Sequence, residues 1–126
     1  MTFGIARLIE DLKELGYEQA ESIADAGGNT FALIKGFEVQ ASRFSGRIID
    51  LAIPAPPDYG RIVGAAIHVK SVPHLLDVSD TVPGQKNITA SNLGPDWRYW
   101  SHQFTYNTEE TTKHLMIQIN GVFKHA

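Results

Sequence analysis

The sequence predicts one α+β domain of two layers, in which a four-stranded antiparallel meander is packed by an N-terminal helix and a C-terminal helix. Apolar residues recur with helical spacing at both ends of the chain, within residues 3–15 and 107–124. Between residues 19 and 70, apolar runs are separated by brief turns, and such short links favour antiparallel pairing. Helices at the two ends of a meander can cover one face of the sheet. The length of 126 residues suits a single domain, residues 1–126.

The first helix is expected over residues 3–15. Thr2 precedes the periodic segment and can cap its start, and Gly16 follows the segment where a left-handed residue commonly ends a helix. Its apolar face consists of Phe3, Ile5, Leu8, Ile9, Leu12 and Leu15.

Four strands are expected next, over residues 19–25, 30–39, 47–53 and 64–70. The turn Gly27–Asn29 is typical of a hairpin, and Gly36 is interpreted as a bulge in the second strand. In the third strand the apolar residues alternate with Asp50, which points to the other side, so that one face is apolar and the other polar. The proline-rich segment 54–60 ends that strand, because proline cannot donate a hydrogen bond to a sheet.

The remainder of the chain is predicted as a loop, an aromatic segment and a helix. Residues 72–94 are rich in proline, glycine and asparagine, and a loop of this length is often functional. The segment 95–104 contains Trp97 and Trp100, which would share one side of a helical turn. They either cover the open face of the sheet or form a groove for a partner. The helix is expected over residues 107–124, with an apolar face of Leu115, Met116, Ile119, Val122 and Phe123.

Composition excludes several classes of protein. The absence of cysteine rules out disulfides, thiolate metal sites, iron–sulfur clusters and a cysteine nucleophile. There is no apolar run of about 18 residues and no signal-peptide pattern, so a cytoplasmic protein without a membrane partner is expected. The net charge is −3 and no basic stripe appears, which argues against a nucleic-acid partner.

The residues alone do not identify a catalytic site. The five histidines lack the tight spacing of zinc enzymes, so no metal or other cofactor is expected. Neither Ser45-Gly46 nor Ser91-Asn92 matches a motif for an activated serine. His68 is expected to face away from Ile67 and Val69 on the fourth strand.

The order of elements and three local stretches resemble the ubiquitin-conjugating-enzyme-like (UBC-like, RWD-like) superfamily. In that family a proline- and tyrosine-containing turn follows the third strand, as in the stretch Ile53–Gly60 here. A long flap follows the fourth strand, as residues 74–94 would. The stretch Trp97–His102 is similar to a prokaryotic branch of the superfamily, which occurs beside ubiquitin-like proteins and their activating enzymes.

The resemblance implies a binding protein, because this sequence departs from the family at the reaction centre. The His-Pro-Asn element of the family is matched only loosely, by Lys86-Asn87-Ile88, and the stretch Thr89–Gly94 contains Ser91 but no thiol. A serine ester is far less reactive than a thioester towards an amine. We therefore expect a non-catalytic UBC-like domain that binds a ubiquitin-like protein, its activating enzyme or another component of a bacterial ubiquitin-like pathway. The expected partner-binding residues are Tyr59, Asn87, Trp97, Trp100 and His102.

Two alternatives remain open at this point. The first is a small enzyme that uses loop side chains in metal-assisted or acid–base chemistry, with His74, Asp77, Asp80 and His102 as candidates. The second is a scaffold that forms homo-oligomers through a sheet edge or the tryptophan pair. The sequence does not set the oligomeric state.

Overall fold

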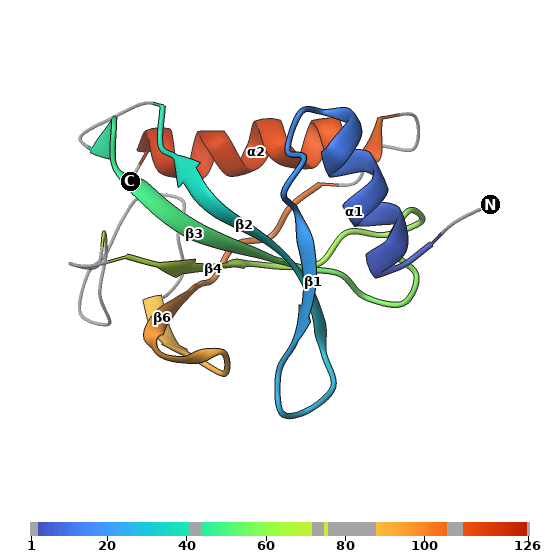
Figure 1. Ribbon diagram of the computed structural model, residues 1–126, viewed down its shortest axis with the longest axis horizontal. Coiled ribbons are helices and arrows are strands. Elements are labelled where there is room, and N and C mark those ends of the chain that lie inside the picture. Colours follow the sequence, from blue (N-terminus) through green and yellow to red (C-terminus); the bar gives the residue numbers. More distant parts are fainter. Residues whose placement is uncertain (1–2, 41–43, 72–74, 76–87, 106–109, 126) are drawn as a thin grey trace.

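A computed structural model describes residues 3–40, 44–71, 75, 88–105 and 110–125, and it places two helices on one side of an antiparallel sheet (Figure 1). The elements in chain order are α1 (Ile5–Glu14), β1 (Glu21–Ala24), β2 (Thr30–Glu38), β3 (Ile48–Pro54), β4 (Ile67–Lys70), β5 (Ile88–Ser91), β6 (Gly94–Trp100) and α2 (Thr111–His125). The predicted α+β class and the two terminal helices are confirmed.

The sheet has six strands in the order β1-β2-β3-β4-β6-β5, so the prediction of four strands is wrong. The end of the predicted loop and the start of the aromatic segment form a hairpin, β5–β6, and β6 pairs with β4. The physical reason lies in β4, where Ile67, His68 and Val69 are all buried. A strand buried on both faces makes a poor sheet edge, and the hairpin covers it.

The first four strands form the expected antiparallel meander. Gly36 has a φ of +70° beside the register shift between Ile34 and Phe37, which confirms the predicted bulge. Gly16 follows α1 with a φ of +104°. The N-cap of α1 is Gly4, without a side-chain cap, and Thr2 lies outside the described residues.

The main core lies between the helices and the sheet. The five apolar residues predicted for the C-terminal helix are all buried there, as are Ile49, Leu51 and Ile53 of β3. On the other face of the sheet lies a smaller cluster, which we call the open-face cluster. It consists of Phe31, Leu33, Ala52 and Trp97, with Ile23 and Leu93 packed against it.

The two tryptophans belong to different cores. Trp100 is buried in the main core, whereas Trp97 belongs to the open-face cluster. The two would share one side only if this segment were helical; it is strand β6, and residues three apart on a strand point to opposite faces. In the described part of the chain, no helix is long and apolar enough to cross a membrane.

Candidate functional site

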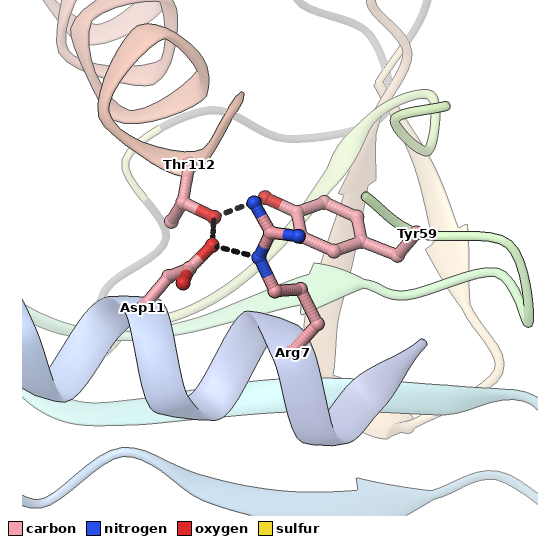
Figure 2. A network of polar contacts seen from close by, with 4 residues as sticks. All are labelled: Arg7, Asp11, Tyr59 and Thr112. Atoms are coloured by element: carbon pink, nitrogen blue, oxygen red, sulfur yellow. Dashed lines mark hydrogen bonds and ion pairs between the residues drawn. The ribbon is translucent and has the colours of Figure 1, made fainter. Parts of the chain in front are cut away.

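Tyr59, the first predicted binding residue, lies in the core between the two helices. Its side chain is fully buried and its hydroxyl lies 2.7 Å from Thr112 Oγ1. Figure 2 shows how this contact continues to α1: the Thr112 hydroxyl donates to Asp11 Oδ2 over 2.7 Å, and Arg7 Nε donates to the same oxygen over 2.8 Å.

The direction of the hydrogen bonds in this network follows from its chemistry. Thr112 has a single hydroxyl proton, which goes to the Asp11 carboxylate, so the Tyr59 hydroxyl donates to Thr112 Oγ1. Burial raises the pKa of Tyr59 to about 12, and the phenol keeps its proton. Tyr59 thus ties the β3–β4 connection to both helices and offers no exposed surface to a partner.

Of the other four predicted residues, the three that the structure describes do not gather at one surface. Trp100 is fully buried, and Trp97, which is 8% exposed, lies on the opposite face of the sheet. His102 is partly exposed and its ring packs 4.7 Å from that of Phe104, measured between centroids. Asn87 lies outside the described residues. That any of these residues binds a partner stays a prediction.

The candidates for the enzymatic alternative also lie largely outside the described part of the chain, which omits His74, Asp77 and Asp80. Among the residues that are described, no group of three or more histidine, aspartate or glutamate side chains is placed to hold a metal ion.

A pocket that the sequence does not predict lies on the side of the sheet opposite the helices. It has a volume of about 660 Å³ and is lined by both the β1–β2 hairpin and the β5–β6 hairpin. Figure 1 shows these two hairpins projecting away from the helices. His68, at its floor, faces away from the main core, as the alternation on β4 predicts.

The most notable contact in this pocket joins His68 to Ser91. Ser91 Oγ lies 2.6 Å from His68 Nδ1 and also accepts a hydrogen bond of 3.1 Å from the Leu93 amide. The imidazole is 6% exposed and packs edge-on against the rings of Phe31 and Tyr99, with centroids 4.9 Å and 5.2 Å away. These contacts fix the orientation of the imidazole.

The protonation state of His68 follows from its burial. Burial lowers the pKa of His68, and the negative charge of Asp25 opposes part of this shift. The resulting pKa is about 4. At neutral pH the imidazole is therefore uncharged, and in the tautomer with its proton on Nε2, Nδ1 accepts a hydrogen bond from the Ser91 hydroxyl. Asp25 itself accepts hydrogen bonds from Gly27 and Asn29, which hold its pKa below the usual value.

The sequence signals for this pair are incomplete. Alternation on β4 places His68 on the correct face, but Ser91 follows a register shift between Ala90 and Ser91. A bulge of this kind changes the direction of the next side chain, and no spacing rule indicates where that side chain points. The pair becomes visible only once β6 is known to lie between β4 and β5.

Comparisons of the chain with models of protein families, with curated proteins and with solved structures found no match.

Proposed function

We propose that this chain is a UBC-like domain that binds a ubiquitin-like protein, its activating enzyme or another component of a bacterial ubiquitin-like pathway, without carrying a modifier as a thioester. The observation that supports it best is the order of elements, a helix followed by an antiparallel meander and closed by a C-terminal helix on the same face. The six-stranded sheet adds the β5–β6 hairpin to that plan.

The absence of a thiol supports the proposal that this domain binds a partner and does not carry a modifier. The whole sequence contains no cysteine, and the stretch from Thr89 to Gly94 has a serine in the region where the family has its nucleophile. A thioester needs a sulfur atom, so thioester transfer to an amine is not available to this chain. Recognition of a partner needs no such atom.

The open face of the sheet is the surface through which we expect binding. Trp97 lies there, and its cross-strand partner on β4 is Lys70, whose side chain shares that face. His102 follows β6 and is partly exposed. Trp97 is 8% exposed and supports this face from within the sheet, whereas the partly exposed Lys70 and His102 are within reach of a partner.

The experiment is a binding titration of the purified chain against bacterial ubiquitin-like proteins and their activating enzymes. Saturable binding to one of them is expected, and Lys70→Glu should weaken it by about tenfold, because charge reversal within an interface opposes association. The matched control is Lys113→Glu, since Lys113 is an exposed lysine on α2 and belongs to the opposite layer.

A lack of binding to every one of these proteins would contradict the proposal. Equal weakening by Lys70→Glu and Lys113→Glu would contradict the choice of face. Thermal unfolding of each variant, measured beside the titration, separates lost binding from lost folding. Sizing of the chain alone would reveal the homo-oligomer that the scaffold alternative requires.

A further inference from the structure

We propose that the pocket on the open face is an ester-cleaving site in which Ser91 is the nucleophile and His68 is the base that takes its proton. The substrates would be small esters that are uncharged or carry a cationic amine. This pocket lies on the same face as the proposed partner binding, but the two proposals rest on different observations and neither depends on the other.

The first argument is the contact itself. A hydroxyl becomes a nucleophile when a base within about 2.6–3.2 Å can take its proton. Ser91 Oγ and His68 Nδ1 are 2.6 Å apart. The Leu93 amide also donates to Ser91 Oγ in a local serine turn, which holds the oxygen in position beside His68 Nδ1.

The second argument is that the base is held in place. The rings of Phe31 and Tyr99 both pack edge-on against the imidazole, so it cannot turn away from Ser91. The carboxylate of Asp25 lies in the wall of the same pocket, and its charge favours the imidazolium that forms when the proton arrives. Serine, histidine and aspartate thus line one pocket, from β5, β4 and the β1–β2 turn.

The third argument concerns the substrate. A pocket of about 660 Å³ lies within the size range of small-molecule sites. Asp25 is the only charged side chain among the described residues that line it. An acyl group with a carboxylate or a phosphate would meet that negative charge without a basic partner, whereas a neutral ester or an amine-bearing ester would not be repelled.

The reaction balances without any further reagent. Ser91 Oγ bonds to the acyl carbon and its proton passes to His68 Nδ1; the bond from carbon to the alcohol oxygen then breaks, and the leaving alcohol takes that proton. In the second half, water gives a proton to Nδ1 and attacks the same carbon, after which the bond to Ser91 Oγ breaks and the serine recovers the proton. The products are a carboxylic acid and an alcohol.

The test uses the full chain and a fluorophosphonate probe, with intact mass and peptide mapping as the readout. We expect one adduct, located on Ser91, and none in Ser91→Ala. His68→Gln should slow labelling by about 100-fold, a typical contribution of a general base. The matched control is Ser45→Ala, because Ser45 is an exposed serine on a different loop, and it should label at the rate of the parent chain.

Two further measurements keep the proposal falsifiable if His68→Gln fails to fold. Asp25→Asn changes an exposed turn, and it should slow labelling by about threefold through the lost charge. Hydrolysis of 4-nitrophenyl acetate should exceed that of the anionic 4-nitrophenyl hemisuccinate, and Ser91→Ala should abolish the difference. An adduct elsewhere than on Ser91, or a labelling rate unchanged in both the His68 and the Asp25 variants, would overturn the proposal.

Discussion

At the scale of single residues, His68 is a titratable side chain that the fold buries on the open face of the sheet. An imidazole at an exposed position would have a pKa near 6.5, whereas burial lowers the pKa of His68 to about 4. Its Nδ1 is in contact with Ser91 Oγ, and the rings of Phe31 and Tyr99 pack against it in T-shaped geometry, so the folded chain accommodates the neutral ring. The cost of charging this ring links folding to pH.

We predict that the free energy of unfolding falls as the pH drops from 6.5 to 4. The unfolded chain binds a proton at His68 in this range and the folded chain does not, so acid favours the unfolded state. The loss should be roughly 2–3 kcal/mol, since each unit of pKa difference corresponds to about 1.4 kcal/mol and residual solvent reduces the effect. Urea titrations at several pH values would measure it.

The control for this prediction is His68→Gln, which carries no titrating group. The difference in unfolding free energy between the parent chain and this variant should be constant above pH 6.5 and should shrink towards pH 4. Asp25, whose pKa its hydrogen bonds with Asn29 and Gly27 lower, is present in both proteins, so its contribution cancels to first order in the difference between them. Parallel curves for the two proteins between pH 4 and 6.5 would contradict the assignment.

At the scale of elements, the hydroxyl of Thr112 joins three parts of the chain. It accepts from Tyr59 in the β3–β4 connection and donates to Asp11 on α1, while Thr112 itself lies in the first turn of α2 (Figure 2). Tyr59 lies 53 positions and Asp11 lies 101 positions from Thr112 in the sequence, and both are hydrogen-bonded to the same Thr112 oxygen. The position of both helices over the sheet depends partly on this atom.

We predict that Thr112→Val destabilises the chain more than Tyr59→Phe does. The valine leaves the Tyr59 hydroxyl buried without an acceptor and removes one donor from Asp11, at a cost of about 2–3 kcal/mol. Tyr59→Phe removes only the hydrogen bond from Tyr59 to Thr112, and Thr112 can still donate to Asp11. The free energy of unfolding should therefore fall by about 1 kcal/mol. Chemical denaturation gives both values.

Thr112→Ser separates the hydroxyl from the methyl group in this comparison. Serine keeps the shared oxygen, so its cost should reflect the lost methyl alone, about 1 kcal/mol. If the valine and serine variants were equally stable, the shared hydrogen bonds would contribute nothing to holding the helices in place.

At the scale of the whole molecule, local periodicity predicted what depends on neighbouring residues in the sequence. Both helices and the first four strands follow from spacing, and Gly36 marked its bulge correctly. The β5–β6 hairpin was missed because Pro95 and Asp96 are unusual within a strand and because the turn at residues 92–93 lacks a hairpin signature. Its existence follows from the need to cover β4, which is a property of the whole sheet.

The candidate site was predicted less well than the fold, for a related reason. Tryptophan and tyrosine side chains can anchor either a partner or a core, and the sequence does not distinguish these uses. Tyr59 and Trp100 are core residues here. The Ser91–His68 pair depends on strands β4, β6 and β5 lying side by side, which is a non-local pairing. Such pairings cannot be inferred from the spacing of residues along one strand.

The division of the molecule into two unequal cores can be tested through its two tryptophans. Trp100 lies in the main core, with its ring 5.3 Å from that of Phe123 on α2, so it joins sheet to helix. Trp97 packs only in the smaller open-face cluster. We predict that Trp100→Ala costs about 4 kcal/mol or more, as expected for a large aromatic residue in a core, and Trp97→Ala about 1–2 kcal/mol.

Trp100→Phe refines the same test. Within the described part of the chain, no acceptor lies within hydrogen-bonding distance of Trp100 Nε1, although the atom is buried. Phenylalanine therefore removes a buried polar group that is not satisfied, and this gain offsets part of the cavity left by the smaller ring. Its net cost in urea titrations should stay below about 2 kcal/mol, well under that of the alanine variant. Similar losses for Trp97→Ala and Trp100→Ala would mean that the sheet is stabilised equally from both faces.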